Sequence, residues 1–263
     1  MDDRTVRPAA ALAACVLLSA CATAGGSLPS PAVSGYLDVA TVNDLADGVS
    51  PPSSSPPSPG DPQPEPPGAD RWWMATSHAE LRPPEAAQHF DCALGTRLGE
   101  TSRPALTRLM NRLLVDAVTV TRRLAALHPR PRPIAVDPEL QPCQRIDAAT
   151  RATPSWPAAE AVAGAAYGEM FAELAPDRAA AARFIGSELG RSRTVCRMNW
   201  PQDVESGQAI GRRVFEAAQQ ESGLPADLEA ARAELAAARA EGLTNPSCAA
   251  ERRALGPMPG AAR

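Results

Sequence analysis

The sequence predicts an all-α fold, a compact helical bundle, on three observations. Hydrophobic residues make up 44% of the 263 residues but aromatic residues only 4%. A core built from Ala, Leu and Val favours close-packed helices over a sheet. Apolar residues recur at helical spacing in several segments, and no alternating strand pattern of useful length occurs. We therefore expect helices packed on helices around one core.

Five helices are expected along the chain. The first is capped by Ser102, carries Pro104 in its first turn and ends before the proline-rich segment 128–133. A loop is expected over 134–153. The other helices are predicted over 155–174, 177–196, 201–220 and 225–240.

Two polar residues are predicted to cap later helices. Ser155 precedes Pro157, which suits the first turn of a helix because its missing N–H costs nothing there. Asp227 is the expected cap of the last helix.

The N-terminus resembles a bacterial lipoprotein signal. Arg4 and Arg7 precede a short apolar run that ends in Leu-Ser-Ala-Cys at Cys21. This run is too short to span a bilayer, so residues 1–20 are predicted to be removed and Cys21 to carry lipid. The alternative is an ordinary secretory signal cleaved nearby. Either signal exports the chain, and we expect a lipid-anchored protein on the periplasmic side of the bacterial envelope, at the outer membrane.

Composition divides the mature chain into a spacer and a domain. Residues 21–68 are expected to form a lipid-anchored tether, because the stretch 51–68 is half proline and cannot form regular helix or sheet. The helical domain is assigned to residues 69–263, with folding expected to begin near Arg71. The net charge of −4 gives no basic footprint, so nucleic acid is not expected as a partner.

Four cysteines remain in the domain after the signal and Cys21 are set aside. They lie in an exported chain, so structural disulfides are expected, with a free thiol at Cys196 as the alternative. Four cysteines permit three pairings, which the sequence leaves open. No Cys-x-x-Cys or Cys/His metal spacing occurs, and neither a metal nor a cofactor is expected. The four are Cys92, Cys143, Cys196 and Cys248.

Three short pieces carry the candidate chemistry. They are Arg132-Pro133, Pro154-Ser155, and Ser192-Arg193 followed by Asp203. Each piece alone is common in proteins. Their order and spacing in an exported helical chain are what make them a candidate functional constellation.

At these residues the sequence resembles the bacterial class A non-specific acid phosphatases, within the type 2 phosphatidic acid phosphatase and vanadium haloperoxidase superfamily. That family carries Lys, six residues, Arg-Pro; then Pro-Ser-Gly-His; then Ser-Arg, five residues, His, three residues, Asp. The likeness runs from Gly-Tyr-Leu at 35–37 through 90–95 to the last predicted helix, which is nearly the whole mature chain.

The resemblance implies roles for the matching positions. Arg132, Ser155, Ser192 and Arg193 would hold a phosphate, because guanidinium forks match phosphate oxygens in pairs. Asp203 would orient the nucleophilic imidazole. In the family one His attacks phosphorus and the other protonates the leaving alcohol.

Four positions depart from the family pattern. The nucleophile position is Asn199, the general-acid position is Pro157, and the lysine position is Ala125. Trp156 replaces the glycine and would narrow or cover the phosphate site, or simply pack. A carboxamide has no nucleophilic lone pair near neutral pH, so the phosphohistidine route is closed at this site.

Other residues are weighed as replacements. His128, near Arg132, is the candidate substitute nucleophile, whereas His78 and His89 are expected to be surface or structural residues. Arg122, one helical turn before Ala125, is the candidate substitute for the lysine.

The function predicted is therefore a lipid-anchored, degenerate acid-phosphatase-like protein. It would bind phosphate or a phosphomonoester, or act in the envelope, without catalysis. The alternative is an acid phosphatase with weak or altered activity, and a third possibility is a structural lipoprotein that binds no anion. Membrane contact is expected only through the lipidated Cys21, and the oligomeric state is left open.

Overall fold

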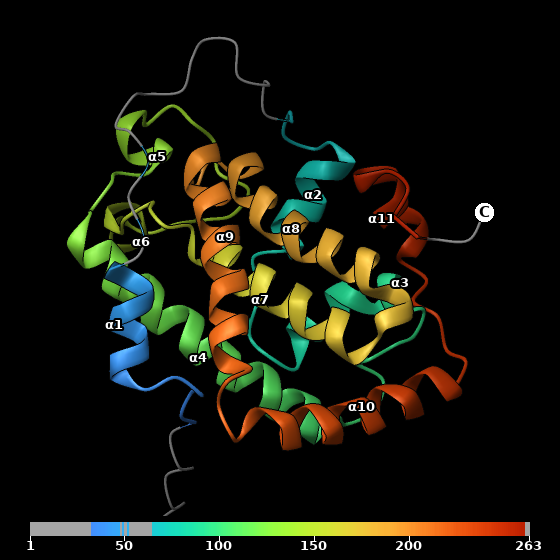
Figure 1. Cartoon of the computed structure of the whole chain (residues 1–263). Coiled ribbons are helices and arrows are strands. Elements are labelled where there is room, and N and C mark those ends of the chain that lie inside the picture. Colours follow the sequence, from blue (N-terminus) through green and yellow to red (C-terminus); the bar gives the residue numbers. More distant parts are fainter. Residues whose placement is uncertain (1–32, 48, 50–51, 53–64, 261–263) are drawn as a thin grey trace, which may run out of the picture. The chain divides into compact units, whose positions relative to one another are not determined.

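The computed structural model describes residues 33–47, 49, 52 and 65–260, and the statements below concern those residues. The regular structure there is entirely helical, which confirms the all-α prediction (Figure 1). The predicted signal peptide, Cys21 and most of the proline-rich spacer lie outside the described residues. The elements are α1 (Val39–Asp47), α2 (Asp70–Ser77), η1 (Glu85–Phe90), α3 (Asp91–Leu94), α4 (Pro104–Leu127), α5 (Pro133–Val136), α6 (Ala148–Ala152), α7 (Ala159–Leu174), η2 (Pro176–Arg178), α8 (Ala179–Val195), α9 (Pro201–Ala218), α10 (Leu224–Ala240) and α11 (Cys248–Leu255).

Helix α7 is the centre of the fold. It contacts α4, α8, α9 and α10, and most of its residues are buried, as expected for a helix that is apolar on all sides. The contact with α8 is close because small residues face each other. A Cβ built on Gly186 would lie 2.5 Å from the carbonyl oxygen of Gly164, so only glycine fits there.

The bounds of helix α4 agree closely with the predicted helix, but the predicted cap was wrong. Its buried apolar residues recur at helical spacing, and it contacts α1, α7, α9 and α10. Ser102 does not cap it. The Glu234 carboxylate from α10 instead accepts hydrogen bonds from the N–H groups of Ala105 and Leu106, each at 2.9 Å.

The two other predicted caps were also wrong. Helix α7 begins at Ala159, and the Ser155 hydroxyl donates to Asp203 rather than binding the helix N-terminus. Helix α10 begins at Leu224 after Gly223, and Asp227 lies inside its first turn. Both side chains instead form hydrogen bonds with residues distant in sequence, Ser155 with Asp203 and Asp227 with Tyr36.

The segment before α1 is fastened to the helical core. The N–H groups of Tyr36 and Leu37 donate to the two oxygens of Asp116 on α4, at 2.9 and 3.1 Å. The Tyr36 hydroxyl donates to Asp227 of α10 at 2.7 Å. The Arg112 guanidinium lies 3.8 Å from the centre of the Tyr36 ring.

The helical domain therefore includes residues 33–47, which were expected to belong to the tether. Tyr36, Val42 and Ala46 are buried in the core cluster. This difference from the expected boundary at residue 69 arises because one short amphipathic helix, α1, packs on α4.

Two disulfides settle the pairing that the sequence left open. Cys92 of α3 is bonded to Cys248 at the start of α11. Cys143 is bonded to Cys196, which ends α8, so Cys196 is not a free thiol. The expected loop 134–153 contains the short helices α5 and α6, and the second disulfide holds it against α8.

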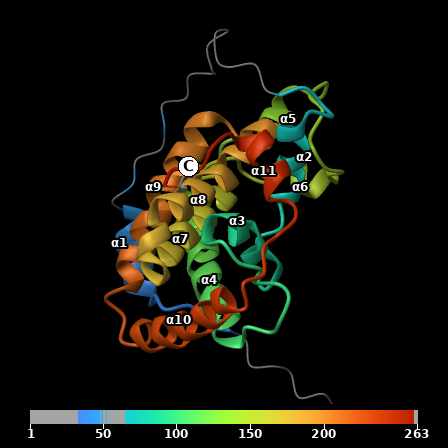
Figure 2. The same cartoon turned by 90° about the vertical axis from the view of Figure 1, so that its right-hand side faces the viewer.

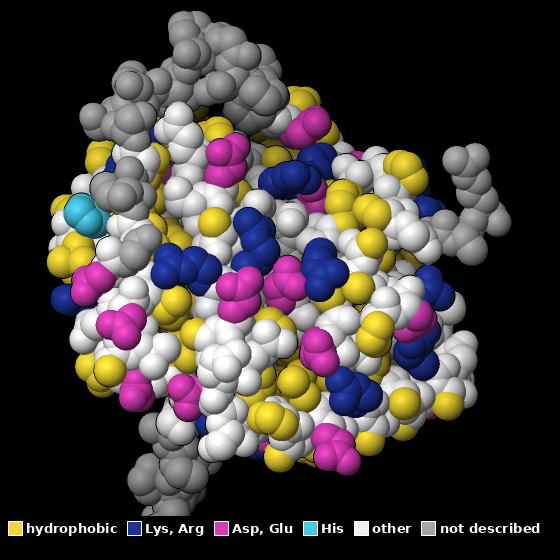
Figure 3. Space-filling view, viewed as in Figure 1, with side chains coloured by type: hydrophobic (Ala, Val, Ile, Leu, Met, Phe, Trp, Pro, Cys, Tyr) yellow, Lys and Arg dark blue, Asp and Glu magenta, His cyan; other side chains and the backbone are white. Residues whose placement is uncertain are grey.

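The surface gives three negative findings for the described residues. Their helices include none long and apolar enough to cross a membrane. No group of three His, Cys, Asp or Glu side chains in the described segments is arranged to hold a metal ion. Figure 3 shows acidic and arginine side chains interspersed over the face viewed there, without a large patch of one sign.

Candidate functional site

Four of the predicted site residues form one hydrogen-bonded network. Arg132 precedes α5, Ser155 precedes α7, Asn199 lies in the turn between α8 and α9, and Asp203 is in the first turn of α9. All four are buried. The turn that carries Asn199 is tight, because Arg197 adopts a left-handed conformation with φ 61°.

Asn199 is fixed by both ends of its amide. Its Oδ1 accepts a hydrogen bond of 3.2 Å from Nη1 of Arg132. Its Nδ2 donates to the carbonyl oxygen of Ser155 at 2.6 Å. The amide therefore links the loop before α5 to the loop before α7, at the position that the resemblance assigns to the nucleophile.

Asp203 also has partners other than an imidazole. Its Oδ2 accepts from the Ser155 hydroxyl at 2.6 Å, and its Oδ1 accepts from Nη1 of Arg130 at 2.9 Å. Burial raises the pKa of this carboxyl above its ordinary value, although the Ser155 hydrogen bond and the charge of Arg130 oppose the shift. Arg130 was not predicted, although it stands in the same proline-rich segment as Arg132.

Arg193 is 1% exposed, and its Nη2 lies 3.2 Å from Oε1 of Glu160. Its Nε and Nη1 are buried and have no hydrogen-bond partner among the described residues. Oε2 of Glu160 is likewise buried without a partner there. A buried guanidinium with two unpaired N–H groups is rare. The arrangement therefore indicates that these groups bind a partner other than the described side chains.

The charges of this cluster are coupled. Burial raises the pKa of Glu160, but the charges of Arg193 and Arg132 outweigh burial, so its pKa is below the ordinary value. Burial lowers the pKa of Arg132, with the nearby charge of Arg193 acting in the same direction and Glu160 against it. Glu160 was missed because it lies three residues after the general-acid position, outside the motif.

Ser192 is not part of this network. Its hydroxyl lies 2.8 Å from Nδ1 of His78, accepts from Nη1 of Arg71 at 2.9 Å and donates to the carbonyl of Glu188. Burial lowers the pKa of His78 well below its ordinary value, so this imidazole is neutral. The prediction that His78 is structural or at the surface agrees with its buried position.

Trp156 and His128 lie together at the edge of the site. Trp156 is 1% exposed and belongs to the main core cluster. His128 is exposed, and its ring meets the Trp156 ring edge-on with centroids 5.6 Å apart. Pro157 is buried and offers no proton, and Arg122 is exposed on α4.

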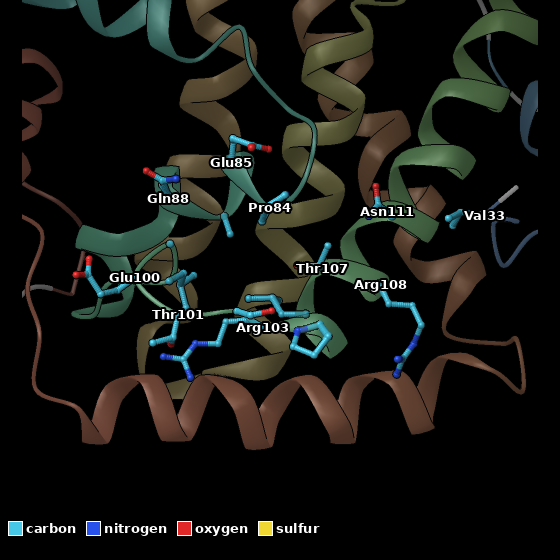
Figure 4. Close-up of a pocket in the computed structure, with 16 residues that line it drawn as sticks. Val33, Pro84, Glu85, Gln88, Glu100, Thr101, Arg103, Thr107, Arg108 and Asn111 are labelled. Carbon is cyan, nitrogen blue, oxygen red and sulfur yellow. The ribbon is translucent and has the colours of Figure 1, made fainter. Parts of the chain in front are cut away.

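The hydrogen-bonded network contains no imidazole, and the Ser155 hydroxyl in it donates to Asp203. The network residues and Arg193 are buried. Glu160 pairs with Arg193, to which the resemblance assigns phosphate, and Asp203 pairs with Arg130, to which it assigns no role. A large open cavity of about 690 Å³ lies elsewhere, where η1 meets the start of α4 (Figure 4). None of its lining residues is a predicted site residue.

Comparison with known proteins identifies relatives. The chain is 31% identical over 173 residues to a protein named acid phosphatase from Zymomonas mobilis subsp. mobilis, covering 65% of each chain. It is 25% identical over 150 residues to a non-specific acid phosphatase of Salmonella typhimurium, covering 56% of this chain and 60% of that protein. A non-specific acid phosphatase of Salmonella typhi is 24% identical over a similar length.

These matches cover less than two thirds of each relative's own length. No family model matches the sequence. All three relatives are named acid phosphatases, which agrees with the resemblance drawn from the Arg-Pro, Pro-Ser and Ser-Arg pieces. These similarities support the assignment of the chain to the acid phosphatase family.

Proposed function

We propose that the protein is a non-catalytic member of its family that binds a phosphate or phosphomonoester through Arg193 and Arg132. The observation that carries this proposal is the buried guanidinium of Arg193, whose Nε and Nη1 lack partners among the described residues. A phosphate oxygen is the partner that guanidinium N–H groups suit best, because charge and fork geometry match together.

The charge balance supports an anionic ligand. Three guanidinium groups, those of Arg130, Arg132 and Arg193, meet two carboxylates, those of Glu160 and Asp203. The cluster therefore has one positive charge in excess. An unbalanced charge in the interior is costly unless a counter-charge accompanies it.

Loss of turnover follows from the groups at the two reacting positions. The Asn199 amide is held by Arg132 and Ser155, and an amide is not a nucleophile toward phosphorus. Pro157 has no proton to give to a leaving alcohol. Loss of acid–base help alone typically costs about 10²–10⁴-fold in rate.

Glu160 sets the conditions under which phosphate enters. Its carboxylate already pairs with Arg193, so an incoming phosphate has to displace it or share the guanidinium. Replacing Glu160 by Gln removes the competing charge while keeping the shape. We therefore expect tighter phosphate binding in Glu160→Gln than in the wild type.

Binding is best tested by calorimetric titration of phosphate and vanadate into the purified protein. Arg193→Lys keeps the charge but loses the fork, and should weaken binding on the order of tenfold, as expected for a charged hydrogen bond. Arg191→Gln is the matched control, because Arg191 lies on the same helix with an exposed side chain paired to Glu188. Equal affinity of wild type and Arg193→Lys would refute the assignment.

A weak phosphatase is the alternative function, and one observation favours it. The exposed imidazole of His128 lies against Trp156, next to Ser155. An aryl phosphate should show no turnover above buffer if the protein is non-catalytic. Turnover lost in His128→Gln but kept in Arg191→Gln would favour the alternative.

Anchoring in the envelope is part of the same proposal. It rests on the lipoprotein-like sequence ending at Cys21, and the two disulfides suit an exported chain. Labelled fatty acid should enter the wild-type protein in bacterial cells and should not enter Cys21→Ser. Equal labelling of both would remove the anchor from the proposal.

A further inference from the structure

A second cavity lies between helices that the candidate anion site does not use. It has a volume of about 620 Å³ and is lined by residues of α2, η1 and α11 together with Glu80 and Cys92. Figures 1 and 2 both show α2 beside α11, although these helices lie near opposite ends of the domain sequence. The volume is in the range of small-molecule sites.

The lining of this cavity is negative. Four carboxylates line it, those of Asp70, Glu80, Glu85 and Glu251, and no arginine is among the described lining residues. Two of the carboxylates already have cationic partners beyond the lining. Asp70 accepts from Nε of Arg253 at 3.2 Å, and Glu80 pairs with Arg82 at 2.7 Å. Glu85 and Glu251 form no ion pair with a described residue within 4.0 Å.

The two histidines of the lining add no positive charge. Burial is the largest cause that lowers the pKa of both His78 and His89, so both rings are neutral near pH 7. Nε2 of His89 donates to the carbonyl of Glu80 at 2.8 Å, which fixes the ring. The electrostatic character of the cavity therefore comes from its carboxylates.

Glu251 is the group that indicates a ligand. It is 6% exposed, and its Oε1 is buried without a hydrogen-bond partner among the described residues. It forms no ion pair with a described residue within 4.0 Å. Burial raises its pKa to about 7, with the charge of Asp91 raising it further and Arg252 opposing. A buried carboxylate without donors is costly, and a bound donor cation relieves that cost.

Trp73 supplies an aromatic surface to the same cavity. Its side chain is 59% exposed, although Trp is usually largely buried. The Trp72 ring meets it edge-on at 4.7 Å between centroids, which fixes its orientation. An organic cation that lies over the face of an indole ring is attracted to it electrostatically. A metal ion surrounded by several oxygen ligands does not make this contact.

We propose that this cavity binds a small primary ammonium ligand, with Glu251 as the buried acceptor and Trp73 as the aromatic contact. The N–H groups of an ammonium supply the donors that Glu251 lacks. A metal ion is disfavoured because no three ligating side chains among the described residues are arranged to hold one. The ligand's alkyl part has Trp73 and Met74 to lie against.

The pH dependence of binding follows from the surroundings of Glu251. The ligand needs the ionised carboxylate, so affinity should rise with pH through about 7. Burial lowers the pKa of His78 and His89, so these rings stay neutral in that range, whereas burial raises the pKa of Asp91. The charged or titratable groups near Glu251 are Asp70, His78, Glu80, Glu85, His89, Asp91, Arg252 and Arg253.

The test is calorimetric titration of putrescine, a diamine, at a pH above 7, with the uncharged 1,4-butanediol as control ligand. Glu251→Gln keeps the side-chain shape and should weaken binding by about tenfold or more, since it removes a charged hydrogen bond. Trp73→Leu should weaken binding about twofold to fivefold. Glu229→Gln, on the exposed part of α10, is the matched control and should bind as the wild type does.

Three outcomes would overturn the proposal. They are absence of putrescine binding at millimolar concentration, equal binding of the diol, and equal loss in Glu229→Gln and Glu251→Gln. Trp73 is exposed, so Trp73→Leu should fold and keeps the test informative if Glu251→Gln proves unstable.

Discussion

The candidate anion site and the cavity beside α11 each contain a buried carboxylate oxygen without a hydrogen-bond partner among the described residues. In the first, the other oxygen of Glu160 meets Arg193 at 3.2 Å, and the pKa is held below its ordinary value. In the second, Glu251 has Asp91 as its strongest charged neighbour, and its pKa rises to about 7. Burial raises the pKa in both places, so the neighbouring charge decides the sign.

The two regions also differ in how their polar side chains are satisfied. Arg132, Ser155, Asn199 and Asp203 satisfy one another and are closed from solvent. The α11 cavity is open and has a surplus of negative charge. Arg193, beside this network, keeps two buried N–H groups without a partner among the described residues, so the candidate anion site and the α11 cavity each retain an unsatisfied buried group, of opposite charge.

The largest expected effect comes from the disulfides, one of which borders each region. Replacing Cys92 and Cys248 by Ser should lower the free energy of unfolding by on the order of 4 kcal/mol, because the bond closes a loop with a separation of 156 residues. Replacing Cys143 and Cys196, separated by 53 residues, should cost slightly less. Denaturant unfolding measures both. A larger cost for the second pair would contradict the loop-length argument.

Glu251→Gln should stabilise the protein above neutral pH by on the order of 2 kcal/mol. The folded pKa of about 7 exceeds the ordinary 4.5, so the folded state holds the proton more tightly. The free energy of unfolding of the wild type therefore falls as the pH rises from about 4.5 to about 7, and the variant should lack this fall. Unfolding curves over this pH range decide it, and parallel curves would contradict the burial of Glu251.

Glu160→Gln should have the opposite sign, a loss of about 1–2 kcal/mol near neutral pH. Its pKa is lowered in the folded state, so its contribution is present above the ordinary value of 4.5 and is lost as the pH falls through the folded pKa. Thermal unfolding of the variant and wild type should converge in acid. A stabilised variant at neutral pH would show that Arg193 does not compensate Glu160.

The smallest expected effect is at the mouth of the open cavity. Arg253 and Asp70 form an ion pair with side chains 63% and 58% exposed, so Arg253→Ala should change stability by no more than about 0.5 kcal/mol. The freed Asp70 carboxylate should nevertheless increase putrescine affinity by about twofold, an attraction that added salt weakens. Unchanged affinity at low salt would place Asp70 outside the ligand's reach.

Sequence patterns predicted the parts of the fold that carry their own periodicity. Helices α4, α8 and α9 lie within a few residues of their expected ranges, because buried apolar residues recur along them. Helices α2 and α11 were missed because each is eight residues long and has few buried residues of its own. Tertiary contacts and the Cys92–Cys248 bond hold them in place. A local sequence pattern predicts neither of these interactions.

The same limit applies to the sites. The hydrogen bonds show that Arg132, Ser155, Asn199 and Asp203, which the motif singled out, lie together in the fold. It could not place Ser192, whose side chain turns to His78 instead. Glu160 and Glu251 were missed because a compensating or unpaired charge depends on neighbours that are distant in sequence.

The attachment of Tyr36 has a mechanical consequence. Backbone hydrogen bonds to Asp116 and the hydroxyl contact to Asp227 join residues 36–37 to two different helices. A pull on the chain ahead of Val33 would therefore load α4 and α10 together before it could peel α1 away. A force applied at Val33 would act on two helices of the core rather than on α1 alone.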